Sequence, residues 1–183
     1  KNKFKKMALT TLDIKEPGLN TLPPGVERYV VEGGGLTGIQ ILPDDEIEII
    51  NNEGNQICEI SVFNKDGKSE LAILGLKEIK DNSEIKKILF KKDETSLQAL
   101  LQLKKRNLNI EKSKSSLIFD KETKAGEKIK FKSKDKCYCI IAAPGKEMIV
   151  HEQNPSTELT VMVKRSIMRE DKDFSLIPDP VYD

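Results

Sequence analysis

The sequence has no tryptophan, a single histidine and few aromatic residues, which make up 5% of its 183 residues. With so few aromatic side chains there is no stacking platform of the kind that binds single-stranded nucleic acid or sugars. The 31 basic and 30 acidic residues nearly cancel, so no net field attracts nucleic acid or an anionic membrane. We therefore expect neither nucleic acid nor a membrane among the partners.

Long hydrophobic runs are also missing. No apolar stretch approaches the roughly 18 to 20 residues that cross a bilayer, and residues 7–12, which follow the basic N-terminus, are too few and too polar for the core of a secretion signal. The chain has three cysteines. An odd number without a secretion signal argues for reduced thiols and against a disulfide framework. We expect a cytoplasmic protein.

The chain divides into three parts by composition. Residues 1–25 are predicted to form an extended arm, because they are rich in lysine and contain two Pro-Gly turns. Residues 26–165 are predicted to form one β-rich domain. Residues 166–183 are a charged tail that ends in a Pro-Asp-Pro segment typical of a linker, so the chain is expected to be the front part of a longer polypeptide.

Within the domain, alternating apolar and polar residues predict strands. These lie at residues 29–31, 39–41, 46–50, 56–63, 117–119, 128–132, 137–142, 148–151 and 159–163. A helical insert is predicted at about residues 82–107, with short helices capped near Asn82 or Ser83 and near Thr95 or Ser96. The order strands, helices, strands predicts an α+β fold. It is mostly antiparallel β, barrel- or sandwich-like, with one or two helices inserted in the middle.

Four leucines of the insert recur at helical spacing: Leu97, Leu100, Leu101 and Leu103. We interpret this stripe as core packing. A groove for a protein partner is the alternative.

Three glycines, Gly33, Gly35 and Gly38, have the spacing of a dinucleotide-binding motif. That motif requires a helix to begin at the third glycine and point its N-terminus at the pyrophosphate. Here residues 39–50 have a strand pattern interrupted by Pro43. We interpret the glycines as a connection between strands.

Cys137 and Cys139 are the most informative pair, because they lie two residues apart in a predicted strand. Alternate side chains of a strand share a face, so both sulfurs point the same way. Their Cα atoms would lie about 6.6 Å apart, near the upper limit for a disulfide. A tetrahedral zinc ion needs sulfurs about 3.8 Å apart, which the pair could supply if its rotamers converge. The pair is thus half of a possible zinc or iron site.

Ligands for the other half are scarce. His151 is the only histidine, Cys58 is the only other thiol, and the obvious oxygen donors are Asp135, Glu59 and Glu152. Two packed thiols are the simpler interpretation, so no firmly bound cofactor is expected. The alternative is zinc or iron held by ligands from the set Cys137, Cys139, Cys58, Glu59 and His151. No pattern places a thiol beside His151, so a nucleophilic Cys-His pair is not supported.

Two stretches of the chain resemble a known family. Residues 30–67, in which Asn52-Glu53-Gly54-Asn55-Gln56 leads into a strand, are similar to the opening of the urea carboxylase-associated family. Its members carry an acidic-Gly-Asn-Gln turn followed by a strand with an aspartate. Residues 126–144 and 154–163 resemble the closing strands, one of which bears cysteine and ends in Ala-Pro or Cys-Pro. Such domains occur alone and ahead of folate-binding aminomethyltransferase domains, as in the trimethylamine-oxide demethylases.

The resemblance implies a mostly β fold with a metal held by cysteines. It aligns Cys137 and Cys139 with a Cys-x-Cys pair of the demethylase-like members, and Glu59 with the aspartate of the family. The family has a His and Cys ligand segment in the centre, whereas residues 70–117 contain neither residue type. We therefore expect a degenerate copy, with no catalytic residues of its own.

The predicted function follows from that resemblance. The chain is expected to be a non-catalytic or accessory module of a folate-linked demethylase or aminomethyltransferase of methylated amine metabolism. It would give scaffold and subunit contacts in a homo-oligomer, and tetrahydrofolate would bind only to a neighbouring domain. One alternative is a small cysteine-ligated zinc or iron enzyme that acts on a small nitrogen compound. Another is a free-standing protein-interaction module.

Overall fold

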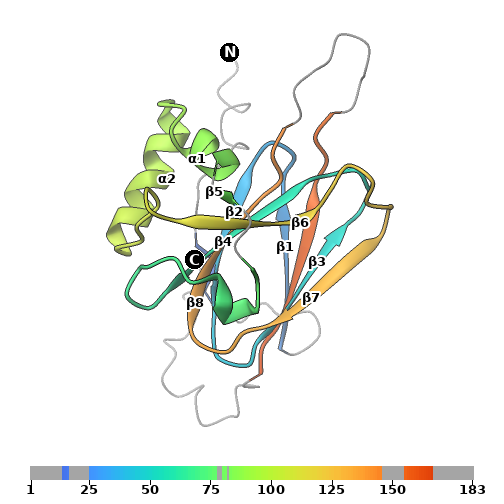
Figure 1. The fold of residues 1–183 in the computed structure, drawn as a ribbon, viewed down its shortest axis with the longest axis horizontal. Coiled ribbons are helices and arrows are strands. Elements are labelled where there is room, and N and C mark those ends of the chain that lie inside the picture. Colours follow the sequence, from blue (N-terminus) through green and yellow to red (C-terminus); the bar gives the residue numbers. More distant parts are fainter. Residues whose placement is uncertain (1–13, 17–24, 78–79, 82, 146–154, 167–183) are drawn as a thin grey trace, which may run out of the picture.

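Two antiparallel sheets make up most of the computed structural model, which describes residues 14–16, 25–77, 80–81, 83–145 and 155–166 (Figure 1). The first sheet has the order β1 (Val26–Val31), β9 (Leu159–Lys164), β3 (Glu46–Asn51) and β7 (Glu127–Lys132). The second has the order β2 (Leu36–Ile41), β8 (Cys137–Ala142), β4 (Cys58–Asn64), β6 (Lys114–Phe119) and β5 (Lys80–Asp81). The predicted mostly β, sandwich-like fold is confirmed.

The main core lies between these two sheets. Apolar residues at alternate positions of both sheets form one buried cluster, which includes Ile47 and Ile49 of β3, Ile39 and Ile41 of β2, and Val161 of β9. A short 3-10 helix, η1 (Leu71–Leu74), also packs on this cluster. The period-2 pattern of the sequence therefore marked the buried face of these strands.

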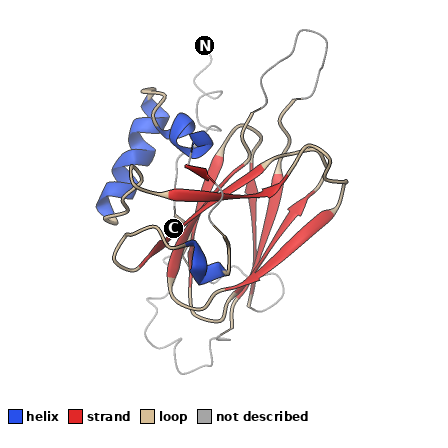
Figure 2. Cartoon of the chain, in the orientation of Figure 1, coloured by secondary structure: helices blue, strands red, loops and turns tan. Residues whose placement is uncertain are grey.

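The second sheet is covered on both faces. Helices α1 (Ser83–Leu89) and α2 (Glu94–Lys105) lie on the face that points away from the first sheet, as Figure 2 shows in blue. There Phe63 of β4 and Ile140 of β8 pack with Ile85 and Leu103 of the helices. This explains why β4 and β8 have nearly continuous buried residues, since a strand buried on two faces has no polar side to show.

The predicted helices are confirmed, but the cap of α2 differs from the expectation. Asp93 is the N-cap, and its carboxylate accepts a hydrogen bond of 2.7 Å from the amide of Ser96. Thr95 and Ser96, predicted as caps, lie inside the first turn. A carboxylate three residues before a free helical amide satisfies it as well as a hydroxyl does, and it also suits the positive end of the helix dipole.

The leucine stripe of α2 is split between two environments. Leu103 is buried against the second sheet, and Leu100 is partly buried there. Leu97 and Leu101 are 51% and 56% exposed. The core-packing interpretation is therefore confirmed only for the first two, because α2 contacts the sheet along a narrower face than the apolar stripe covers.

The glycine-rich segment connects β1 to β2, and Gly38, where a dinucleotide-binding motif would begin a helix, lies within β2. At Gly33 a Cβ would lie 2.5 Å from the carbonyl oxygen of Ser156, so a side chain has no room there. The interpretation as a strand connection is confirmed. The strand predicted at 148–151 lies outside the described residues, as do most of the arm and tail. Among the described residues no helix has the length and apolar character of a membrane span.

Gln56 joins the ends of both sheets. Its side-chain amide donates to the carbonyls of Ile57 (2.8 Å) and Pro144 (3.0 Å), and its oxygen accepts from the amide of Thr157 (2.8 Å). The carbonyl of Gln56 in turn accepts from the side chain of Asn51 (2.8 Å). The acidic-Gly-Asn-Gln turn thus positions a side chain that ties the β3–β4 turn to the end of β8 and the start of β9.

We predict that Gln56→Ala lowers the free energy of unfolding by about 2 to 3 kcal/mol, because it leaves the Thr157 amide and the Pro144 carbonyl without their partner in a buried site. Gln56→Glu can still accept from Thr157 but cannot donate to Pro144, so it should also be destabilising. Urea unfolding measures both. Gln40→Ala is the control, because the hydrogen bonds recorded for Gln40 use its main chain. Equal midpoints for Gln56→Ala and Gln40→Ala would contradict the assignment.

Candidate functional site

Cys137 and Cys139 of β8 both point into the core between the sheets, as their spacing predicts. Both thiols are free and fully buried, and their sulfurs lie 3.9 Å apart. Tyr138 points to the opposite face, toward the helices. The strand geometry therefore brings the two sulfurs to about the separation found between thiolates on a tetrahedral zinc ion.

The two thiols differ in acidity. A hydrogen bond with Cys139 holds the pKa of Cys137 below its usual value, although burial opposes this shift, and the Ser133 hydroxyl 3.6 Å away acts in the same direction as Cys139. The pKa of Cys139 is raised well above its usual value, because that residue hydrogen bonds to Cys137 and is buried. The two opposite shifts arise from one hydrogen bond, so the pair titrates as a unit.

Two of the other predicted ligands, Cys58 and Glu59, lie away from the pair. Cys139 lies opposite Val62 of β4. Cys58 is on the same face of β4 but four residues away from Val62, which is about 13 Å along a strand. Glu59 follows Cys58 and so points to the other face. His151 lies outside the described residues. Cys58 and Glu59 are adjacent in β4, so the thiol and the carboxylate lie on opposite faces of the sheet.

The fit to a metal ion is incomplete within the described residues. The two sulfurs supply half of a tetrahedral shell. No group of three or more His, Cys, Asp or Glu side chains that could hold an ion exists in the part of the chain that the structure describes. A complete shell would need ligands from outside those residues or from another chain.

Glu59 has a structural partner on the helical side of the second sheet. Its buried carboxylate accepts a hydrogen bond of 2.6 Å from the Ser115 hydroxyl. Burial raises the pKa of Glu59, while hydrogen bonds from Ser115 and from the backbone of Ile85 and Glu84 act against that rise. Those amides belong to the first turn of α1. Glu59 therefore satisfies the N-terminus of a helix from a neighbouring strand.

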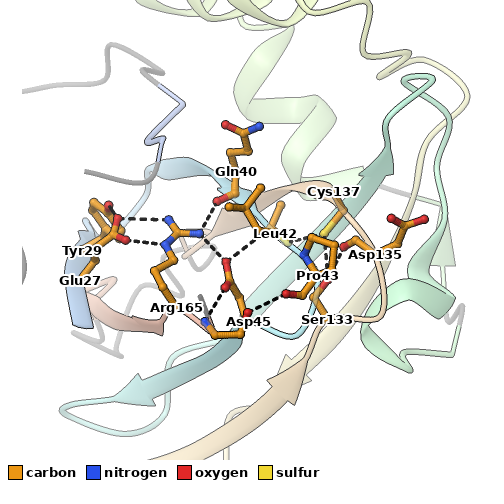
Figure 3. A network of polar contacts seen from close by, with 12 residues as sticks. Glu27, Tyr29, Gln40, Leu42, Pro43, Asp45, Ser133, Asp135, Cys137 and Arg165 are labelled. Atoms are coloured by element: carbon orange, nitrogen blue, oxygen red, sulfur yellow. Dashed lines mark hydrogen bonds and ion pairs between the residues drawn. The ribbon is translucent and has the colours of Figure 1, made fainter. Parts of the chain in front are cut away.

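Arg165 is at the centre of a buried polar cluster that sequence reasoning missed (Figure 3). It follows β9, and its guanidinium forms ion pairs with Glu27 of β1 and with Asp45, which precedes β3. The distance to Asp45 is 2.7 Å, and a further hydrogen bond of 2.9 Å reaches the Gln40 carbonyl of β2. We call Arg165, Glu27 and Asp45 the Arg165 cluster. It joins strands of both sheets.

Each carboxylate of the cluster has additional donors. The Tyr29 hydroxyl donates a hydrogen bond to Glu27. Asp45 accepts two hydrogen bonds of 2.9 Å, from the amides of Leu42 and Ser166. Burial opposes the charge on Arg165, but the hydrogen bonds to Glu27 and Asp45 outweigh it and raise its pKa. Burial and the contact with Glu27 raise the pKa of Tyr29 as well. The buried charges of the Arg165 cluster are thus compensated by opposite charges and by hydrogen bonds.

The cluster extends toward the cysteine pair. The amide of Ser133 donates to the carbonyl of Asp45 at 2.9 Å, and the hydroxyl of Ser133 donates to the carbonyl of Asp135 at 2.6 Å. The same hydroxyl is the group near Cys137. In the sequence, Glu27 lies in a strand, Asp45 in a turn and Arg165 after a strand, and none of these positions is unusual for a charged residue. Arg165 is 120 residues from Asp45 and 138 from Glu27, so no local pattern indicated that they pair.

We predict that Arg165→Met lowers the free energy of unfolding by about 3 to 5 kcal/mol, because Glu27 and Asp45 then remain buried without a counter-charge. Arg165→Lys keeps the charge but not the fork of donors, so its loss should be smaller. Denaturant unfolding measures both variants. The cluster would be unimportant for stability if Arg165→Met unfolded at the wild-type midpoint, and Arg165→Lys gives the comparison if Arg165→Met does not fold.

We predict that Glu59→Gln gains stability relative to the wild type as the pH rises above about 4.3, the pKa of an unfolded glutamate. A carboxyl with a raised pKa in the folded state stabilises the fold below its unfolded pKa, and this contribution is lost as the pH rises through the folded pKa. The amide can still accept from Ser115. Urea unfolding across pH measures the difference, with Glu122→Gln as the exposed control. A flat or falling difference would contradict the burial of a charged Glu59.

Comparison with known proteins found sequence similarity to part of an enzyme. No family model matches it. It is 34% identical over 171 residues to a trimethylamine-oxide aldolase of Ruegeria pomeroyi, and the alignment covers 93% of this chain and 21% of that protein. The chain thus spans about a fifth of the length of the curated relative that it matches. The expected link to trimethylamine-oxide demethylase proteins is confirmed at this level: the chain is related to one part of a trimethylamine-oxide aldolase.

Proposed function

We propose that this chain is a non-catalytic structural module of a protein that acts on methylated amine oxides. The similarity to part of a trimethylamine-oxide aldolase supports the chemical setting. The resemblance to the urea carboxylase-associated family supports the same setting, with a folate-binding domain as the neighbour that completes the one-carbon chemistry. The module would work in the cytoplasm, within a homo-oligomer.

One observation carries the proposal: among the residues that the structure describes, Arg165, Glu59 and the cysteine pair are buried against other parts of the protein. Arg165 has two carboxylates and a carbonyl as partners. The carboxylate of Glu59 serves Ser115 and the N-terminus of α1. Cys137 and Cys139 lie in the closed core between the sheets. A catalytic group must reach a substrate, and these groups face other parts of the protein.

A supporting role suits the shape of the fold. Two sheets and a pair of helices give broad outer faces, while the polar groups that fix their geometry are inside. Such a unit can hold a neighbouring domain or subunit in place. The interaction would use surface residues and would leave the buried clusters undisturbed.

We predict that the purified chain contains well under one equivalent of zinc or iron and releases no formaldehyde from trimethylamine oxide. Elemental analysis and a formaldehyde assay measure these two properties. Cys137→Ser tests the thiol pair, and Cys58→Ser is the matched control, because Cys58 is equally buried but lies away from the pair. One equivalent of metal that is lost in Cys137→Ser and kept in Cys58→Ser would overturn the proposal, in favour of a metal centre completed by ligands outside the described residues.

A further inference from the structure

Helix α2 has an exposed apolar face that belongs to neither hydrophobic cluster of the described residues. Leu97 and Leu101, which we call the leucine pair, are four residues apart and therefore lie on one side of the helix. They are the most exposed large hydrophobic residues among those that the structure describes, at 51% and 56%. Phe90, in the turn between α1 and α2, is exposed as well. Single exposed apolar residues are common, but an aligned pair on a helix is typical of a contact surface.

Basic residues flank this apolar face. Lys104 and Lys105 follow Leu101 by three and four residues, so they lie on the same side of α2, and both are exposed. Lys91 and Lys92 are exposed just before the helix. The leucine pair thus lies between basic residues, with Asp93 and Glu94 at the start of the helix as the acidic exception. A ligand with apolar residues and acidic neighbours would complement this surface.

The chain itself contains such a segment. Residues 170–183 have five acidic residues and one lysine, together with Phe174, Leu176, Ile177, Val181 and Tyr182. By contrast, residues 1–6 contain four lysines, so the N-terminal end of the chain has the wrong sign. We call residues 170–183 the acidic tail.

We propose that the acidic tail docks on the leucine pair of α2 in the same molecule. The spacing of apolar residues agrees on the two sides. In an extended segment Phe174 and Leu176 point the same way about 6.6 Å apart, and Leu97 and Leu101 are separated by about 6 Å along the helix axis. The five acidic residues and one lysine of the acidic tail give it a net charge opposite to that of the lysines around the leucine pair.

The tail is long enough for this contact. Leu176 lies ten positions after Ser166, the last described residue. An extended chain of that length spans up to about 33 Å, roughly twice the radius of gyration of about 16 Å expected for 183 residues. The docked tail would cover the apolar face when no other surface does, and a partner of similar chemistry would have to displace it.

The experiment uses Phe174→Trp in the full chain, which has no other tryptophan. Docking predicts that the introduced indole has a blue-shifted emission and is less quenched by acrylamide than in a peptide of residues 167–183 with the same substitution. Adding Leu97→Gln and Leu101→Gln should remove the shift, and glutamine keeps the helix propensity of leucine closely. Val30→Thr, at an exposed apolar residue of β1, is the control and should keep it. Circular dichroism checks the helices in each variant.

A second arm tests the charges. Lys104→Glu with Lys105→Glu should weaken the shift, and Asp171→Lys with Asp173→Lys in the same chain should restore it. Emission equal to that of the free peptide, or a shift that survives the two glutamine substitutions, would overturn the proposal. A shift that grows with protein concentration would also overturn it, because the tail would then dock on a second copy of the chain.

Discussion

The buried guanidinium of Arg165 links the two sheets through two ion pairs and a hydrogen bond. A charge inside a protein is tolerated only when hydrogen bonds and opposite charges replace the water that it loses. Here the partners come from β1, from the main chain of β2 and from the turn before β3, so both sheets must be in place before the charge is matched. The cluster therefore favours one relative arrangement of the two sheets at the end of the sandwich that contains Arg165.

The opposite end is fixed by neutral hydrogen bonds. Arg165 and Asp45 adjoin the ends of β9 and β3 at which Lys164 pairs with Glu46, whereas Gln56 and Thr157 adjoin the ends at which Leu159 pairs with Asn51. Polar contacts thus hold the two ends, and apolar packing fills the space between them. The turn that carries the family resemblance lies at one of these ends. Its Gln56 stabilises the fold by hydrogen bonds, and this structural role does not require that the turn takes part in a reaction.

The three-layer arrangement also decides what the candidate site residues can do. Because the second sheet is covered by the first sheet on one face and by helices on the other, its central strands β4 and β8 have nearly all of their side chains buried. Cys137 and Cys139 face the first layer, and Glu59 faces the helices. Residues that would be neighbours in a metal site are thus placed in different layers. The interaction surface that remains is on the outside, where α2 presents its leucine pair.

Most strand positions, both helices and the common face of Cys137 and Cys139 could be predicted from side-chain periodicity, which is a property of neighbouring residues. The two-residue strand β5 was not predicted, because it is too short for a periodic pattern. The sequence also excluded a dinucleotide site at Gly33 to Gly38, because the following residues have a strand pattern. The sequence did not reveal that Arg165 pairs with Glu27 and Asp45 or that Glu59 contacts α1. Nor did it reveal that Leu103 is buried while Leu97 and Leu101 are exposed. These outcomes depend on strand order and on which face of a sheet is covered, and they join residues too far apart in the chain for any local pattern to reveal.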